Sequence, residues 1–302
     1  MTRTALILGP SGKIGTHMAD ALWNAGWRIR PFVRGTDMVA AAKGCDLIVN
    51  GLNPPNYHDW ARIIPRITAQ VIAAAQSSGA TVLIPGNVYN LGTEPGPWTT
   101  GTPHRPTTRK GRIRAEMEAA YRASGVRTIV LRAGNFIDPN RNADVLSLFV
   151  LRSVASGRVV HGGDPDARLA WAYLPDWARA ATGLVEMADR LPRFADIPFA
   201  GHTASVRDIA NAVAQVTGRA TRLSAFPWWM MRLASPVWEL ARELLEMRYL
   251  WTMAHSLDPA PLAALLPDLA STPLVKAIAA SLPPEVHPDQ PVRAGRLHVA
   301  AE

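Results

Sequence analysis

The chain has 302 residues and 48% of them are hydrophobic, which suffices for a sizeable core in one large domain or two closely packed lobes. The net charge of +8 comes from singly scattered arginines, which argues against a basic patch for nucleic acid or membrane. Cys45 is the only cysteine, so no disulfide forms within the chain and a cytoplasmic setting is expected. The sequence has no signal-peptide pattern and no apolar run long enough to span a bilayer.

The N-terminal stretch predicts a nucleotide site. Residues 4–8 are apolar and branched, as in a buried parallel strand, and a helical pattern follows from Ile14. The turn between them has the spacing Gly-x-x-Gly-x-x-Gly. Glycines suit such a turn because, without a Cβ, they let a pyrophosphate approach the helix N-terminus. The predicted cofactor contacts here are Gly9, Ser11, Gly12, Lys13, Ile14 and Gly15.

The end of the second predicted strand, residues 27–33, bears on the choice of cofactor. Arg34 follows this strand, where the fold contacts the adenosine ribose. An arginine there favours the 2′-phosphate of NADP, whereas Asp37, slightly further on, keeps NAD open. The alternative is a surface arginine with no ligand.

Strands and helices then alternate. The predicted strands are 46–49, 81–84 and 128–131, and the predicted helices are 59–78, 110–124 and 145–156. This alternation predicts right-handed crossovers and a doubly wound parallel α/β sheet of the Rossmann type. Ligands of such sheets bind at the carboxyl ends of the strands. The loops there supply further predicted cofactor contacts, namely Gly51, Leu52, Asn53 and Asn87.

The remaining sequence predicts a smaller, mainly helical substrate lobe. Residues 169–174 read as extended, Asp176 is expected to cap a helix over 177–189, and Ser205 one over 206–217. A helix is expected to run to about Met253 after the Trp-rich segment 226–231. That segment is interpreted as core, lid or dimer contact, since the following acidic helix would bind anionic lipid poorly. The predicted domains are 1–192, with substrate-lobe segments interleaved near 136–170, and 193–302.

Several motifs occur together in the order of a known superfamily. They are the glycine turn, the loop 50–55, Tyr89, Leu-Arg-Ala-Gly-Asn-Phe at 131–136 and Tyr-Leu-Pro-Asp-Trp-Ala-Arg-Ala at 173–180. As a set they resemble the extended or atypical short-chain dehydrogenase/reductases, the NAD-dependent epimerase/dehydratase group, over about the first 215 residues. The resemblance implies a Rossmann domain with a partly interleaved substrate lobe. Asn135 matches the asparagine that lines the substrate cleft of this superfamily, and Phe136 and Tyr89 are expected beside it.

The sequence departs from that superfamily at its catalytic motif. Tyr-x-x-x-Lys is expected at the start of the helix after the long loop, with a glutamate four residues beyond the lysine. When Glu118 is aligned with that glutamate, Lys110 falls at the position of the motif's tyrosine and Arg114 at the position of its lysine. The usual phenol acid/base is therefore absent there. The Ser/Thr expected after the fourth strand is also missing, and Asn87 stands in that region.

Two residues remain as acid/base candidates. Residues 110–114, Lys-Gly-Arg-Ile-Arg, are similar to the Lys-x-Lys-x-Arg segment of isoflavone-reductase-like and NmrA-like members, which implies a catalytic or cofactor-contacting Lys110. The alternative for Lys110 is a basic residue on an exposed first turn. Tyr89 follows the fourth strand and is either the acid/base group or a packing tyrosine.

The leading hypothesis is an NADP-dependent oxidoreductase that transfers hydride between the nicotinamide and a carbonyl or activated double bond of a small organic substrate. The rival is a non-catalytic NAD(P) sensor of the NmrA-like kind, and a sugar-nucleotide epimerase or dehydratase is the third option. We find no metal-ligand spacing and no Ser-His-Asp arrangement. Nucleic acid and membrane are not expected as partners, and the chain is predicted to be a monomer or homodimer.

Overall fold

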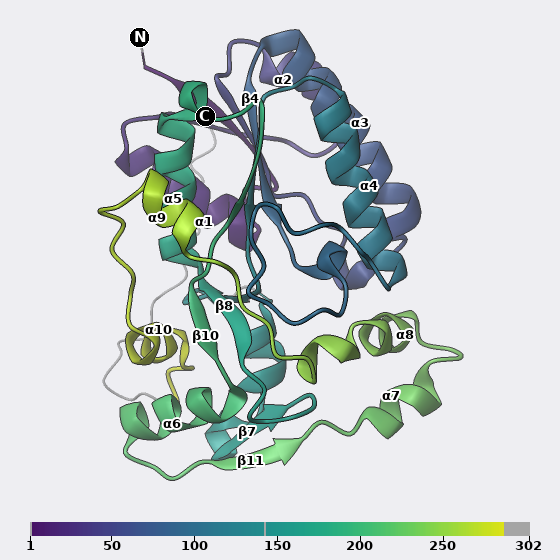
Figure 1. Ribbon diagram of the computed structural model, residues 1–302, viewed down its shortest axis with the longest axis vertical. Coiled ribbons are helices and arrows are strands. Elements are labelled where there is room, and N and C mark those ends of the chain that lie inside the picture. The colour runs from purple at the N-terminus through teal and green to yellow at the C-terminus, as the bar shows by residue number, and fades with distance from the viewer. Residues whose placement is uncertain (1, 142, 287–302) are drawn as a thin grey trace.

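A six-stranded parallel sheet organises the computed structural model, which describes residues 2–141 and 143–286 (Figure 1). Its strand order is β2-β1-β3-β4-β5-β9. The strands are β1 (Thr4–Leu8), β2 (Arg28–Pro31), β3 (Leu47–Asn50), β4 (Thr81–Gly86), β5 (Thr128–Arg132) and β9 (Phe194–Pro198). The order changes direction between β1 and β3, which in open α/β sheets is the point where ligands bind.

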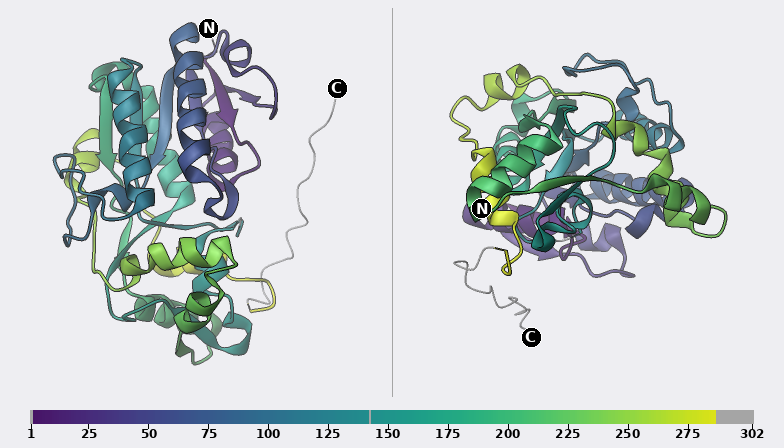
Figure 2. Two further views of the ribbon diagram at one scale, coloured as in Figure 1. Left: turned by 90° about the vertical axis from the view of Figure 1, so that its right-hand side faces the viewer. Right: turned by 90° about the horizontal axis from the view of Figure 1, so that it is seen from below.

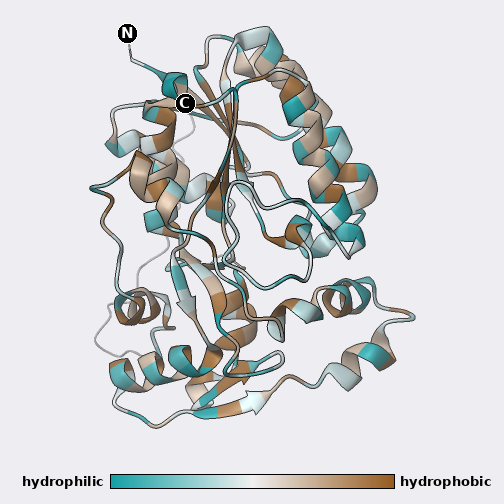
Figure 3. Cartoon of the chain, in the orientation of Figure 1, coloured by the Kyte–Doolittle hydropathy of each residue, from teal (hydrophilic) through white to brown (hydrophobic). Residues whose placement is uncertain are grey.

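Helices cover both faces of this sheet, as Figures 1 and 2 show. One face carries α1 (Lys13–Asn24) and α5 (Leu174–Glu186), and the other carries α2 (Met38–Ala42), α3 (Trp60–Ser78) and α4 (Arg109–Ala123). Because both faces are covered, β1, β3 and β5 are buried along their whole length and their residues are almost all apolar (Figure 3). The predicted doubly wound fold is therefore confirmed.

A second lobe packs below the sheet in Figure 1. It contains a three-stranded sheet of β10 (His202–Ala204), β8 (Leu169–Tyr173) and β6 (Asn135–Ile137), and a pair formed by β11 (Arg222–Ala225) and β7 (Arg158–His161). Its helices are α6 (Val206–Thr217), α7 (Trp228–Ala234), α8 (Glu239–Glu246) and α10 (Leu274–Ser281), whereas α9 (Ala260–Leu265) packs near β9. Three strands of this lobe precede β9 in the chain, so the two lobes are interleaved. The parallel sheet extends beyond residue 192 because β9 pairs with β5.

Three predicted helices differ in the structure. Residues 145–156 form only a π-helical turn, Leu146–Val150, and a 3-10 turn, Val154–Ser156, since the chain turns back there into β7. The helix predicted to start after Asp176 begins at Leu174, and Asp176 instead binds Arg179 and Thr272. The helix predicted to reach Met253 is divided into α7 and α8 around Pro236, whose ring cannot continue a helix.

Within the described residues, no helix is both long and apolar enough to cross a lipid bilayer.

Candidate dinucleotide and active site

The glycine turn leaves room in front of α1. Gly9 has a φ of +72°, in the left-handed region that favours glycine, and a Cβ on Gly15 would lie 2.1 Å from the Gly9 carbonyl oxygen. Among the described residues, a Cβ on Gly12 would meet only that same oxygen, at 3.3 Å. The first turn of α1 has no side-chain cap and no acidic residue, so its positive end is available to an anion. This cradle fits a dinucleotide pyrophosphate.

The loop after β3 lies against the glycine turn. A Cβ on Gly51 would be 2.7 Å from the Leu8 carbonyl oxygen, and one on Gly9 would be 3.1 Å from the Gly51 carbonyl oxygen. The Leu52 N–H donates to the Asn50 side chain, which holds the loop, and Asn53 is exposed. The residues predicted from the two loops are therefore brought together at the carboxyl edge of the sheet.

The side chain of Lys13 is bound elsewhere and does not contact the space proposed for the pyrophosphate. Its Nζ donates to the Ala143 carbonyl oxygen at 2.6 Å. Burial lowers the pKa of Lys13, against the attraction of Asp144 and Asp138. The buried His17 also contacts Asp138, at 2.8 Å from Nε2 to Oδ1, so α1 is tied to the loop that follows β6. The predicted cofactor contact of Lys13 can therefore be made by its backbone N–H at the start of α1, but not by its side chain as it lies here.

Arg34 is exposed beyond the end of β2 and makes no hydrogen bond or ion pair with the described residues. Asp37, the alternative ribose ligand, caps α2 instead, because its Oδ1 accepts from the Val39 N–H at 2.9 Å. Arg30, on β2 itself, donates to the carbonyls of Ala41 and Lys43. Among the charged groups here, Arg34 is therefore the one with its donors available to a 2′-phosphate.

Lys110 is fully buried, which contradicts the alternative of an exposed basic residue on a first turn. Its Nζ forms ion pairs with Glu243 and Glu246 of α8, the latter at 2.7 Å, and donates to the Glu243 carbonyl oxygen at 3.1 Å. Its backbone N–H donates to Glu246 as well. Nζ therefore makes two hydrogen bonds and one further close ion pair, all to α8, although Glu243 Oε2 itself has no hydrogen-bond partner among the described residues. A role for Lys110 in catalysis or cofactor binding would require α8 to release it.

Tyr89 pairs with a second phenol, Tyr57. Their hydroxyl oxygens are 3.3 Å apart, and Nζ of Lys110 lies 5.0 Å above the Tyr57 ring. The pKa of Tyr57 is raised well above its ordinary value by Tyr89, by burial and by the charges of Glu243 and Glu246. Burial also raises the pKa of Tyr89, although the Tyr57 hydrogen bond and the charge of Arg114 oppose this. Both phenols therefore keep their protons at neutral pH.

Arg114, which aligns with the superfamily lysine, lies near enough to Tyr89 for its charge to lower the pKa of that phenol. Its Nη2 donates to the Pro85 carbonyl oxygen at 2.5 Å, while its buried Nε has no hydrogen-bond partner among the described residues. Asn87 accepts from the Tyr89 N–H through Oδ1, at 3.1 Å. These contacts fix the start of the loop after β4, at the edge that also carries the glycine turn.

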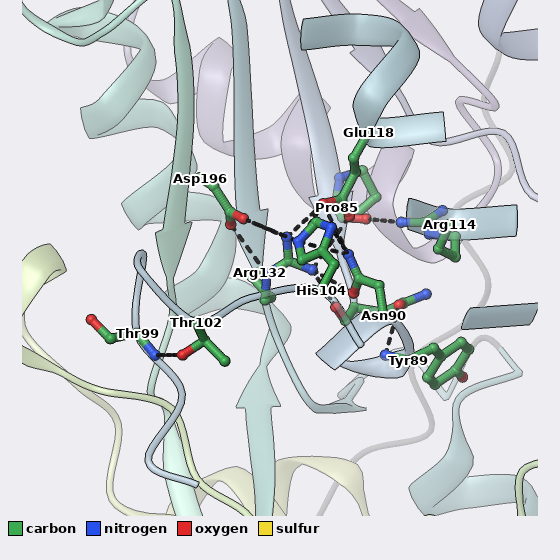
Figure 4. A network of polar contacts seen from close by, with 11 residues as sticks. Pro85, Tyr89, Asn90, Thr99, Thr102, His104, Arg114, Glu118, Arg132 and Asp196 are labelled. Atoms are coloured by element: carbon green, nitrogen blue, oxygen red, sulfur yellow. Dashed lines mark hydrogen bonds and ion pairs between the residues drawn. The ribbon is translucent and has the colours of Figure 1, made fainter. Parts of the chain in front are cut away.

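A buried network, seen in Figure 4, holds the same loop from the other side. Arg132 of β5 binds Glu118 and Asp196, with N–O distances of 2.6 Å to each, and also binds Asn90. His104 lies beside both carboxylates. Although His104, Glu118 and Asp196 could together ligate a metal, the Arg132 guanidinium already supplies a positive charge between the two carboxylates and would repel a cation.

Asn135 and Phe136 lie on β6, where the two lobes meet. Both side chains are partly buried, and the Phe136 ring meets Trp177 edge-on, with centroids 6.0 Å apart. Among the described residues, neither side chain forms a hydrogen bond or ring contact with Tyr57, Tyr89 or Lys110. Their predicted substrate contact stays a prediction.

Tyr57, Glu243 and Glu246 belong to the site but were not foreseen from the sequence. Tyr57 follows a loop that was interpreted only as far as residue 55, and its φ of +60° is unusual for a bulky residue. The spacing of Glu243 and Glu246 puts both on one face of a helix, which was the available signal. Nothing local indicated that this face meets Lys110.

Comparison with solved structures identifies the fold. A UDP-glucuronic acid 4-epimerase from Bacillus cereus in complex with UDP-glucuronic acid and NAD has a TM-score of 0.74 at 14% identity, covering 92% of this chain and 97% of that one. A UDP-glucose 4-epimerase from Brucella ovis with NAD gives 0.72 at 16% identity, covering 92% and 96%. The Bordetella bronchiseptica enzyme WbmH with NAD+ gives 0.70 at 17% identity, covering 93% and 97%.

At these identities the likeness shows a shared fold, the NAD-binding Rossmann fold of the epimerases, which confirms the predicted architecture. No protein-family model matches the chain, and no curated protein sequence matches it.

Proposed function

We propose that the chain is an NAD(P)-dependent oxidoreductase of the atypical short-chain type, acting on a carbonyl or activated double bond of a small organic substrate. One observation carries the proposal: two features lie together at the carboxyl ends of β1, β3 and β4. The first is the N-terminus of α1, which has no side-chain cap and faces the space in front of Gly12, and the second is the Tyr57–Tyr89 pair. A bound nicotinamide dinucleotide would supply or accept the hydride.

Tyr89 is the proposed proton donor of the reduction. Its O–H proton passes to the substrate oxygen as the adjacent carbon gains the hydride, which leaves a phenolate on Tyr89. Tyr57, whose hydroxyl is 3.3 Å away, then donates a hydrogen bond to that phenolate, and the positive charge of Arg114 stabilises it. In this proposal Lys110 acts on the site through α8 and does not handle the proton.

Gly12→Val is expected to abolish dinucleotide binding without unfolding the protein. The added side chain fits against the protein, since its Cβ would approach only the Gly9 carbonyl, but its methyl groups would fill the space in front of α1. Isothermal titration with NADPH and NADH measures binding, and circular dichroism measures folding. Gly101→Val is the matched control, because a Cβ there meets nothing within 4 Å. A folded Gly12→Val variant that still binds either dinucleotide would contradict the assigned site.

NADPH is expected to bind more tightly than NADH, because Arg34 presents unpaired donors and Asp37 is engaged as a cap. Arg34→Ala should lower the NADPH affinity by about 1.5–3 kcal/mol, roughly 10- to 100-fold, and leave the NADH affinity nearly unchanged. Arg28→Ala, which removes an exposed arginine at the start of β2, is the control. Equal affinities of the wild-type protein for the two dinucleotides would show that Arg34 does not select the cofactor.

A second candidate, a non-catalytic NAD(P) sensor, is favoured by the complete engagement of Lys110 with α8. A third, a sugar-nucleotide epimerase or dehydratase, is favoured by the fold likeness to UDP-sugar enzymes. Incubation with NADPH and a panel of aldehydes, ketones and enones, followed at the absorbance of NADPH, tests the oxidoreductase. An epimerase would instead convert a UDP-sugar without net oxidation of cofactor, and a sensor would bind NADPH and consume none with any substrate.

A further inference from the structure

The second lobe carries a helical hairpin that projects from the body of the protein. It consists of α7 and α8, which pack on each other and extend to the right in Figure 1, and the right-hand view of Figure 2, seen from below, shows the same projection. Its base is anchored, because Trp228 is buried and its Nε1 donates to the Gly162 carbonyl oxygen at 2.5 Å. Phe226, Phe149 and Trp251 surround this anchor. The Trp-rich segment is therefore partly core, as expected.

The outer part of the hairpin is apolar and exposed. Nine large apolar side chains are exposed among the described residues, and five of them lie between residues 229 and 238. These five, called the tip residues below, are Trp229, Met230, Leu233, Val237 and Trp238. Single exposed apolar residues are ordinary, but five within ten residues of one projecting element are a concentration of the kind found at interaction surfaces.

The acidic side chains of the hairpin pair with the body of the protein, whereas two of its arginines are exposed near the tip residues. All three glutamates of α8 are paired with basic residues of the body: Glu239 with His58, Glu243 with Arg109 and Lys110, and Glu246 with Lys110. Two of the acidic side chains that argued against lipid binding in the sequence, Glu243 and Glu246, are thus largely buried against the body, and the more exposed Glu239 is neutralised by His58. Arg232 and Arg242 are exposed beside the tip residues. Arg242 also donates to the Ser235 carbonyl oxygen and so closes the turn between the helices.

We propose that the tip of the hairpin is a docking surface for an anionic lipid bilayer. Two exposed tryptophans with three aliphatic side chains suit the headgroup–acyl boundary, where amphipathic rings are favoured. Arg232 and Arg242 would contact lipid phosphates, and the net charge of +8 attracts the protein to such a surface. The hairpin would lie in the interface rather than cross the membrane. This binding is independent of the proposed oxidoreductase activity.

Cosedimentation of the full-length protein with vesicles tests the proposal. Phosphatidylcholine vesicles containing phosphatidylglycerol should bind the protein, more weakly in high salt, and pure phosphatidylcholine vesicles should bind it less. A Trp229→Ser/Leu233→Ser/Trp238→Ser variant should lose about tenfold or more in partitioning, because it removes three apolar side chains that would be buried in the bilayer interface. Arg232→Glu should abolish the preference for the anionic vesicles.

The matched control is Trp23→Ser/Leu148→Ser, which removes two apolar side chains of similar exposure elsewhere on the surface. It should bind vesicles like the wild-type protein. Sedimentation velocity distinguishes lipid docking from a contact between two copies of the chain. A wild-type dimer that the triple variant converts to a monomer, with no vesicle binding, would overturn the proposal. So would vesicle binding that the triple variant retains in full.

Discussion

Replacing Lys110 with methionine is expected to lower the free energy of unfolding by about 3–5 kcal/mol, because it takes a buried cation away from two carboxylates at once, Glu243, which keeps Arg109, and Glu246. Methionine has nearly the shape of the lysine stem, so most of the loss comes from charge rather than from packing. Chemical denaturation of the wild-type and variant proteins measures the difference. Lys276→Met, on the exposed surface of α10, should change the stability by less than about 0.5 kcal/mol.

A combined variant separates the ion pair from other effects of the substitution. In Lys110→Met/Glu243→Gln/Glu246→Gln no carboxylate is left unpaired at this place, and most of the lost stability should return. If Lys110→Met is as stable as Lys276→Met, the contacts of α8 with Lys110 do not stabilise the fold. The turnover of the combined variant then tests whether Lys110 takes part in catalysis. A large loss of rate in a stable protein would support the hypothesis that Lys110 is the catalytic residue.

Most of the parallel sheet could be predicted because its signals are local. The apolar run before Gly9, the glycine spacing and the helical pattern after Ile14 lie within one strand–turn–helix unit, and the structure confirms β1 and α1 almost residue for residue. Ser205 likewise caps α6 as expected, with Asp208 completing a capping box. Such features depend on near neighbours in the chain, so the sequence reports them directly.

The candidate cluster around Lys110 and the two tyrosines could not be predicted because it depends on contacts between distant elements. Lys110 and Glu243 are 133 positions apart, and no spacing rule links them. The same limit explains the error over residues 145–156, where apolar residues recur at helical spacing but the chain turns into β7 instead. The Trp-rich segment was ambiguous for a related reason. Only packing distinguishes the buried Trp228 from the exposed Trp229.

Tyr89→Phe is expected to lower turnover about 100-fold or more on an identified substrate, because it removes the proposed proton donor and keeps the ring. The affinity for NADPH should stay nearly unchanged, since the pyrophosphate cradle is formed by other residues. Tyr57→Phe should have a smaller effect on turnover, because Tyr57 only donates a hydrogen bond to the phenolate that forms. Steady-state rates and titration with NADPH measure the two effects separately.

The control for this comparison is Tyr249→Phe. Tyr249 is close enough to Tyr89 for their charges to interact, but its buried hydroxyl has no hydrogen-bond partner among the described residues. Removing that hydroxyl therefore takes away a phenol without breaking a contact, and turnover should hold. If the Tyr89→Phe variant turned over substrate as fast as the Tyr249→Phe variant, a group other than Tyr89 would have to donate the proton. Lys110, freed by a movement of α8, would then be the next candidate, because its Nζ lies 5.0 Å from the centroid of the Tyr57 ring.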